Sequence, residues 1–412
     1  MSPSIKHPIF TYHTLHNGLQ CVIRHSTHAA EYCGLAINAG SRDDFPGMEG
    51  LAHFVEHTIF KGTLHRRAGH ILNRMESVGG ELNAYTTKEL TMLYSVFPPG
   101  NMQRALELIA DLVAYSQFPT SELTKEREVV ADEIDTYLDM PCDAVYDDFE
   151  DLIFANSALG HNILGSKTSI DLFTTEACRN YVSRHYVPSQ MALFYQGPES
   201  AAKVIKMAEK YFGVLNHPAP EQTRVKPTIS EPFTVTRNID SHQAHCVMGC
   251  RIPDMYSPSR HAISLLTNLV GGPGMNSMLN IALREKRGLV YSVEATSQFL
   301  TDAGLFMIYF GCDPEDAPRC LRLVNSVLRR IADTPPSGTA LERAKRQYLG
   351  QMVLSHDSTE QTALGAARAV LYHGSAWTLE QMTERISSIT ADDMRTAAEL
   401  MFAPSLSTLI LR

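Results

Sequence analysis

The chain alternates short apolar segments with longer segments in which apolar residues recur every three or four positions. Short apolar or alternating runs predict β-strands, and the wider spacing predicts amphipathic helices. In the first half, the order predicted is strand, strand, helix, helix, strand, strand, helix, helix, strand. The corresponding ranges are 19–24, 33–39, 50–60, 71–75, 82–85, 90–97, 105–115, 122–138 and 191–195.

The second half repeats this order of elements. Its ranges are 233–237, 245–251, 260–270, 278–284, 290–295, 304–311, 317–332, 340–354 and 406–411. Between the halves, residues 216–232 are rich in proline and read as a linker. The pattern predicts an internal duplication of one α+β domain, with copies at 1–215 and 233–412. Each copy is expected to hold a mostly antiparallel sheet with helices packed on it.

The composition narrows the class of protein. The chain has 412 residues, of which 44% are hydrophobic and 20% charged, and a formal net charge of −9. These are values of a globular protein, and the acidic balance disfavours a nucleic-acid partner. We expect no membrane span and no signal peptide, because long apolar runs and a basic start are missing. The eight cysteines form no C-x-x-C pair, which predicts buried free thiols and a cytoplasmic location.

Candidate chemistry begins with two histidines four positions apart, His53 and His57, in a segment with helical apolar spacing. On a helix they lie one turn apart on the same face, so both imidazoles can bind one ion. Two imidazoles, a carboxylate and a water form a ligand set that suits zinc. Glu56 flanks the same face, within reach of that water. The alternative is a pair of structural histidines beside a solvated glutamate, and the position of Glu56 favours the metal.

A third ligand has to come from another segment. Residues 121–140 predict a long charged helix, on which Glu126 and Glu133 share nearly the same direction after two turns. Spacing alone does not choose between these two and the helix's other acidic residues, which are Glu128, Asp132 and Asp135.

The His-x-x-Glu-His motif resembles the inverted zinc motif of the pitrilysin-like metallopeptidases, the inverzincins, and the resemblance covers nearly the whole chain. It implies one zinc ion per chain, held by His53, His57 and Glu133, although manganese or cobalt suits the same ligands. It also implies Glu56 as the general base. Glu126 matches the family's supporting carboxylate, which orients a ligand histidine.

Residues 79–86 are similar to the family's substrate-binding edge strand. The backbone of such a strand pairs with an extended peptide. The resemblance implies that Asn83, Ala84 and Tyr85 bind the substrate, and the alternative is an ordinary hairpin.

In the half without the zinc motif, Arg284 and Tyr291 match a family pair with the same spacing. The resemblance implies that both anchor the substrate and stabilise the oxyanion, and the alternative is a structural role. The nearby glycine-rich segment, 271–274, fits a family loop, and we interpret it as a tight turn between helices.

The length is similar to that of the small two-domain subfamily that includes the mitochondrial processing peptidase and bacterial homologues. This likeness implies a homodimer with an internal chamber, in which Arg284 and Tyr291 reach the zinc across the interface. The expected activity is endopeptidase cleavage of unfolded oligopeptides. Two alternatives remain, a dedicated precursor- or leader-processing peptidase and a non-catalytic scaffold subunit of the same fold.

Overall fold

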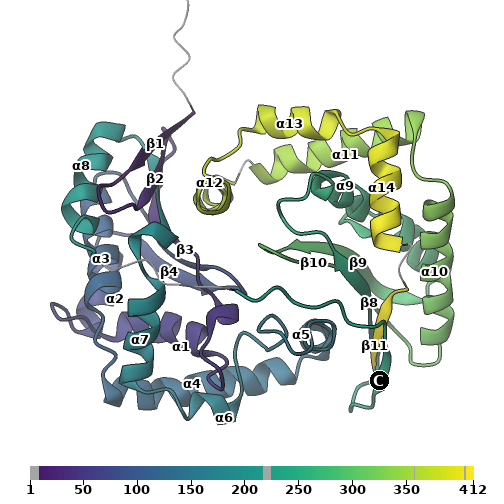
Figure 1. The fold of residues 1–412 in the computed structure, drawn as a ribbon, viewed down its shortest axis with the longest axis horizontal. Helices are drawn as coiled ribbons and strands as arrows, with labels where there is room; N and C mark the ends of the chain where they lie inside the picture. The colour runs from purple at the N-terminus through teal and green to yellow at the C-terminus, as the bar shows by residue number, and fades with distance from the viewer. Residues whose placement is uncertain (1–8, 217–223, 357, 403–404) are drawn as a thin grey trace, which may run out of the picture. The chain divides into compact units, whose positions relative to one another are not determined.

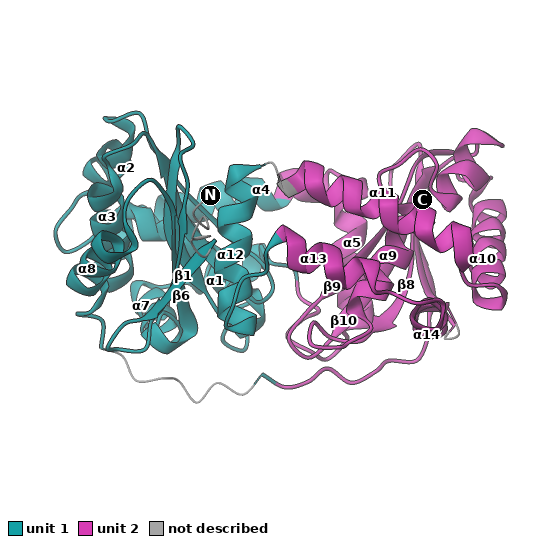
Figure 2. Ribbon diagram, turned by 90° about the horizontal axis from the view of Figure 1, so that it is seen from above, with its two compact units in different colours: residues 1–134, 162–224, 356–378 teal, residues 135–161, 225–355, 379–412 magenta. Residues whose placement is uncertain are grey.

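The computed structural model describes residues 9–216, 224–356, 358–402 and 405–412 (Figure 1). The chain divides into two compact units, each built from three segments of the sequence (Figure 2). Unit 1 consists of residues 1–134, 162–224 and 356–378, and unit 2 of residues 135–161, 225–355 and 379–412.

Unit 1 is organised around a six-stranded mixed sheet with the order β1-β2-β6-β3-β5-β4. The strands are β1 (Phe10–Thr14), β2 (Gln20–His25), β3 (Glu31–Ile37), β4 (Glu81–Thr86), β5 (Thr91–Phe97) and β6 (Met191–Gly197). Strands β2 and β6 are parallel, and the other neighbours are antiparallel. Strand β4 is therefore at an edge of the sheet, the position from which a strand can pair with another chain.

The two faces of this sheet are covered differently. One face carries α1 (Leu51–Thr58), α2 (Ala68–Glu76), α3 (Met102–Tyr115), α7 (Thr175–His185) and α8 (Ala201–Phe212), with α4 (Thr120–Leu138) beside them and the short α6 (Lys167–Ile170). The other face carries α12 (Thr359–His373), as Figure 1 shows by the positions of α3, α8 and α12. Ala36 and Ala192 pair on that face and meet Ala363 and Ala367 of α12. Small residues on both surfaces let the helix lie close to the sheet.

Unit 2 repeats the plan with five strands in the order β7-β11-β8-β10-β9. They are β7 (Thr234–Arg237), β8 (Ala244–Ile252), β9 (Val290–Phe299), β10 (Gly304–Cys312) and β11 (Ser407–Leu411). Strands β7 and β11 are parallel and the other neighbours antiparallel. Strand β9 is the edge strand that corresponds to β4.

One face of this sheet packs on α9 (Arg260–Gly271), α10 (Ala317–Asp333), α11 (Gly338–His356), α13 (Leu379–Ser387), α14 (Ala391–Phe402) and the π-helical turn η4 (Asn280–Glu285). The opposite face packs on α5 (Pro141–Ile153), whose Phe149 and Ile153 are fully buried. Figure 1 shows α5 and α10 on opposite sides of this sheet.

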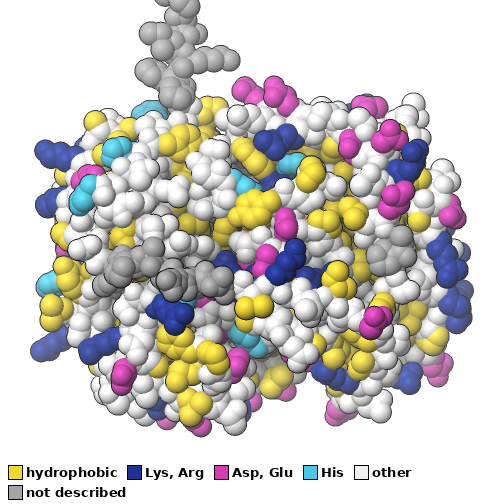
Figure 3. Space-filling model, in the orientation of Figure 1, with side chains coloured by type: hydrophobic (Ala, Val, Ile, Leu, Met, Phe, Trp, Pro, Cys, Tyr) yellow, Lys and Arg dark blue, Asp and Glu magenta, His cyan; other side chains and the backbone are white. Residues whose placement is uncertain are grey.

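Helix α10 illustrates why these segments form helices. Its buried residues Cys320, Val324, Val327 and Ile331 recur at the spacing of one helix face. Its exposed face carries four arginines, and Figure 3 shows basic side chains gathered along that edge of unit 2. They are Arg319, Arg322, Arg329 and Arg330.

The predicted α+β fold class with two sheet-and-helix copies is confirmed, and the sheets are mostly antiparallel as expected. The compact units differ from the contiguous halves 1–215 and 233–412. Helix α12, from the second half of the sequence, packs on the sheet of unit 1, and helix α5, from the first half, packs on the sheet of unit 2. The predicted linker, 216–232, includes residues 217–223, which lie outside the described residues. Arg224, just after them, donates to the buried carboxylate of Asp43 at 2.7 Å.

All eight cysteines are free thiols. Seven are buried as predicted, and the prediction is wrong for Cys142, which is exposed. Cys142 follows Pro141 in the first turn of α5, where its side chain is outside the core formed by Val145 and Phe149. Within the described ranges, no helix is both long enough and apolar enough to cross a membrane.

Candidate metal centre

Helix α1 is held at its N-terminus by a carboxylate from outside the helix. Asp44 accepts hydrogen bonds at 2.7 Å from the backbone N–H groups of Gly50 and Ala52, two of the donors that a helix start leaves unsatisfied. Gly50 has a φ of 97°, and a Cβ there would lie 2.6 Å from the carbonyl oxygen of Leu164. Only glycine fits that position. Because Phe54 and Val55 are fully buried in the core, the direction of the remaining side chains is fixed.

The imidazoles of His53 and His57 lie side by side, with ring centroids 4.5 Å apart. Glu133 approaches them from α4. Its Oε2 lies 3.8 Å from Nε2 of His53 and 3.5 Å from Nε2 of His57. The structure thus brings together the three residues that the resemblance implies as ligands, and it leaves the side chain of Glu133 42% exposed.

These three side chains fit a zinc ion. One ligand atom from each lies within 4.8 Å of the others, and zinc ligands at bond lengths of about 2.0–2.2 Å lie roughly 3.3–3.6 Å apart in a tetrahedron. Burial and the neighbouring His57 lower the pKa of His53 to about 3, which keeps its imidazole in the neutral form that binds metals. Among the described residues, this is the single group of three His, Cys, Asp or Glu side chains with such spacing.

Glu126 orients one of the two histidines. Its Oε1 lies 3.1 Å from Nδ1 of His57, and its Oε2 lies 2.7 Å from Nζ of Lys61. Glu126 is 6% exposed, so the lysine neutralises a buried carboxylate, and the carboxylate in turn directs Nε2 of His57 toward Glu133. The buried Nδ1 of His53 has no such partner among the described residues.

Lys61 was missed by the interpretation of the sequence. Its position one turn after His57 is the available signal, because residues four apart share a helix face. The α-helix ends at Thr58, and Lys61 closes the short 3₁₀ turn that follows.

Glu56 is fixed by a contact that spacing does not reveal. Thr86, the last residue of β4, donates a hydrogen bond of 3.1 Å to Oε2 of Glu56. Burial raises the pKa of Glu56, while His57 and the Thr86 hydrogen bond oppose that rise. One hydrogen bond therefore links the glutamate beside the histidines to the edge strand of the sheet.

The predicted substrate-binding residues Asn83, Ala84 and Tyr85 all lie on β4. In the described part of the chain, β4 pairs only with β5. One side of its backbone is therefore open to an added strand. The binding role of these residues stays a prediction.

Arg284 and Tyr291 lie in unit 2. Arg284 is exposed on η4, and Tyr291 is exposed on β9, where its hydroxyl donates to Asp313 at 2.9 Å. This hydrogen bond and the charge of Asp313 raise the pKa of Tyr291. A π-helical turn often accompanies functional residues, but the roles of Arg284 and Tyr291 stay predictions.

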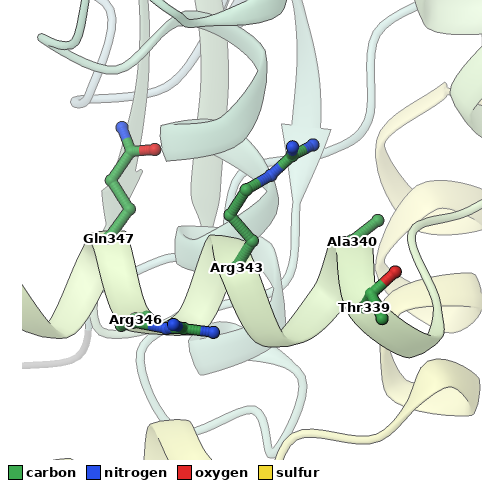
Figure 4. A pocket seen from close by; sticks show the side chains of 5 residues that line it. All are labelled: Thr339, Ala340, Arg343, Arg346 and Gln347. Atoms are coloured by element: carbon green, nitrogen blue, oxygen red, sulfur yellow. The ribbon is translucent and has the colours of Figure 1, made fainter.

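A groove of about 550 Å³ runs along α11 in unit 2 (Figure 4). Its lining residues are Thr339, Ala340, Arg343, Arg346 and Gln347. This lining contains no side chain that readily binds zinc, so the groove is not a candidate metal centre.

Two sheet-and-helix units with a helical His-x-x-Glu-His motif and a glutamate from a second helix are the arrangement of an inverzincin metallopeptidase. Residues 20–167 match the model of the insulinase family, peptidase family M16, and residues 173–348 match the model of the peptidase M16 inactive domain. The chain belongs to peptidase family M16. The match to the domain described as inactive covers the end of the first half and much of the half without the zinc motif, and it includes none of His53, His57 and Glu133.

Relatives of similar length are described as zinc proteases. An uncharacterized zinc protease of Streptomyces coelicolor is 30% identical over 409 residues, which cover 96% of this chain and 88% of the relative. The uncharacterized zinc protease YmxG of Bacillus subtilis is 29% identical, with 95% of each chain covered.

Two solved structures share the fold. A protease from Helicobacter pylori has a TM-score of 0.89 at 22% identity, with 98% of this chain and 100% of that chain covered. A structure described as a peptidase M16 inactive domain, from Pseudomonas fluorescens, also has a TM-score of 0.89, at 18% identity, with 98% and 97% covered.

Proposed function

We propose that this protein is a zinc-dependent endopeptidase that hydrolyses unfolded oligopeptides. The observation that carries the proposal is the meeting of His53, His57 and Glu133 within 4.8 Å, with Glu56 on the same helix. The relatives described as zinc proteases support the choice of metal. The free thiols support a cytoplasmic location.

Zinc held by His53, His57 and Glu133 would supply Lewis acidity, which lowers the pKa of water toward about 7 and stabilises charge on the scissile carbonyl oxygen. Glu56 would take a proton from the attacking water as its oxygen bonds to the scissile carbon. Glu56 would then give a proton to the leaving amine. The Thr86 hydrogen bond holds one oxygen of Glu56 in place, so the other oxygen is free for these transfers.

The open edge of β4 would hold the substrate as an added strand. Backbone pairing at Asn83, Ala84 and Tyr85 fixes the main chain and gives little sequence preference by itself. Because a folded protein does not present an extended segment, unfolded peptides are the expected substrates. In a homodimer with an internal chamber, Arg284 and Tyr291 of one chain would donate hydrogen bonds to the oxyanion at the zinc of the other.

The test compares the wild type with Glu56→Gln, which keeps the size of the side chain and removes the base. We expect one zinc per chain in both proteins and a loss of about 10²–10⁴-fold in cleavage of a quenched mixed-sequence peptide by the variant. The matched control is Glu128→Gln on the exposed side of α4, which should leave both quantities unchanged.

Retained activity in Glu56→Gln would show that another group acts as the base. A folded, zinc-loaded wild type that cleaves no peptide would favour a scaffold subunit or an enzyme that needs a second, different chain. Cleavage of one precursor but not of the mixed peptides would favour a dedicated processing peptidase.

A further inference from the structure

The residues of β4 alternate between the two faces of the first sheet. Leu82 and Ala84 pack against the core that holds α1, and Thr86 hydrogen-bonds to Glu56 on that same side. Tyr85 packs instead against the cluster that includes α12. Because side chains of a strand alternate, Glu81 and Asn83 lie on the same face as Tyr85, opposite to the candidate metal centre.

One flank of α12 faces this side of the edge. Glu360, at one end of the helix, accepts a hydrogen bond of 2.8 Å from the hydroxyl of Tyr94 in β5. Tyr372, at the other end, donates at 3.0 Å to the carbonyl of Glu89, just before β5. Arg368 is two turns after Glu360 and one turn before Tyr372, so it lies on the same flank.

The guanidinium of Arg368 is available to a ligand. Its side chain is exposed, and none of the ion pairs between described residues involves it. Burial raises the pKa of Tyr85, the positive charge of Arg368 opposes that rise, and the negative charge of Glu360 adds to it, which agrees with a position of both side chains close to the phenol. At the other end of β4, Glu81 is exposed. Near Tyr85 the face thus carries the unpaired positive charge of Arg368 beside Glu360, whose carboxylate accepts the Tyr94 hydrogen bond, and near Glu81 it is negative.

We propose that the α12-facing side of β4 is a side-chain subsite in which Arg368 selects an acidic residue of the peptide. The proposal rests on the proposed peptidase function. A peptide added to the open edge of β4 places successive side chains on opposite faces of the sheet. A side chain beside Thr86 faces Glu56, and its neighbour along the peptide, beside Tyr85, faces α12. A carboxylate there meets the planar fork of Arg368, which suits bidentate pairing.

The same geometry predicts a second preference of opposite sign. Glu81 is four residues before Tyr85 on the same face, so a basic side chain four residues away from the acidic one would meet Glu81. The preferred substrate is therefore an extended peptide with an acidic residue next to the cleavage region and a basic residue four positions further along, which is two strand repeats of two residues.

The test uses quenched peptides that differ only by Asp, Asn or Lys at one position, scanned along a common sequence. For the wild type we expect the best position to favour Asp over Lys by about fivefold in kcat/KM, the effect of a partly exposed ion pair. Arg368→Gln should remove this preference, Arg368→Glu should reverse it, and Arg368→Lys should keep its sign. Cleavage of the Asn peptide should change little in all variants.

Arg67→Glu is the matched control, because it reverses an exposed charge of unit 1 that lies outside this face. It should keep the wild-type preference. The same Asp-to-Lys ratio in the wild type and Arg368→Glu, with both proteins active, would overturn the subsite and leave the peptidase standing. A zinc-loaded wild type that neither cleaves the peptides nor binds the Asp peptide better than the Lys peptide would overturn both proposals.

Discussion

In unit 1, the helix that follows β3 presents His53, Glu56 and His57 along one side. In unit 2, the helix in the same place after β8 is α9, which presents mainly Ile263, Leu265 and Leu266 to its own core. The two helices cover similar sheets, so the scaffold does not require ionisable groups at this place. A pair of adjacent histidines, one of them buried, is costly unless it is bound or neutral, and α9 has no such pair, so the difference between the helices agrees with the metal centre proposed for unit 1.

Helix α5 in unit 2 and helix α12 in unit 1 each cover the second face of a sheet, and they differ in the opposite way: here it is unit 1 that has the unpaired charged group. Over the edge strand β9 of unit 2, Tyr146 of α5 donates a hydrogen bond to Glu294 of β9. At the opposite edge of the same sheet, Asp148 of α5 pairs with Arg237 of β7 at 2.9 Å. Over the edge strand of unit 1, Arg368 of α12 has no acidic partner among the described residues. Tyr146 and Glu294 near β9 satisfy each other, whereas the corresponding face near β4 keeps the charge of Arg368 available for a ligand.

The largest expected effect removes the chemical difference between α1 and α9. His53→Ala deletes one of the three proposed ligands, so we expect less than one zinc per chain and a peptidase activity at least about 10³-fold lower. His261→Ala makes the same change on α9 and should alter neither quantity. Metal analysis and peptide hydrolysis measure both, and full zinc and activity in His53→Ala would remove the proposed centre.

The next effect concerns the free energy of unfolding of unit 1, measured apart from that of unit 2. Asp111, 5% exposed on α3, accepts hydrogen bonds of 2.8 Å from Thr63 and 2.7 Å from Arg66, and its Oδ1 lies 2.5 Å from Nδ1 of His65. Asp111→Asn removes the buried negative charge beside His65 and Arg66 and leaves Arg66 with Glu107 as its remaining acidic partner, which should cost about 3 kcal/mol. Trp377 is the single tryptophan and belongs to unit 1, so its fluorescence during urea unfolding reports on that unit.

The pH dependence of this loss follows from the pKa of Asp111. Burial would raise that pKa, but the hydrogen bonds from His65, Arg66 and Thr63 together lower it below its ordinary value of 3.8. A carboxyl with a lowered pKa stabilises the folded state above the ordinary value and loses that contribution as the pH falls through the folded value. The difference between wild type and Asp111→Asn should be constant from neutral pH to about 5 and shrink below pH 3.8.

The control for this measurement is Glu122→Gln, which breaks a surface pair with Lys125. Its effect should stay below about 0.5 kcal/mol. An unchanged urea midpoint for Asp111→Asn would mean that the segment after α1 is not held by this carboxylate.

The candidate site shows which parts of such a structure can be predicted from sequence. The positions of His53, Glu56 and His57 follow from helical periodicity alone. Glu133 does not, because it comes from a distant helix whose several acidic residues are equivalent by spacing, and only the family resemblance selects it. Contacts of Lys61 and Thr86 depend on how α4 and β4 pack against α1, which no local pattern records.

The strands of both sheets could be predicted from local sequence patterns. Helices α5 and α12, which each pack on the sheet of the opposite half of the chain, could not be placed in this way. Strands such as β3, β5 and β10 read as apolar runs of the right length. Helix α12 is rich in alanine, with its buried contacts made by Ala363, Ala366 and Ala367. Small residues give a weak periodic signal, and nothing in their order shows that the helix packs on the sheet of the other half of the chain.

The smallest expected effect tests whether the Tyr146–Glu294 pair near β9 is structural. Tyr146→Phe removes the hydroxyl that donates to Glu294 and keeps the ring that packs beside Tyr309. We expect a loss of about 1 kcal/mol in the stability of unit 2, because a single hydrogen bond contributes little net free energy. Backbone hydrogen exchange of β9 and β10 measures this loss, and Tyr137→Phe, which removes a comparable hydroxyl contact to Asp147 away from β9, is the control.

The Asp-to-Lys preference in peptide cleavage should not change, because the pair lies in unit 2 and Arg368 lies in unit 1. A changed Asp-to-Lys preference in Tyr146→Phe would mean that the face near β9, and not only the face near β4, interacts with the charged side chain of the peptide.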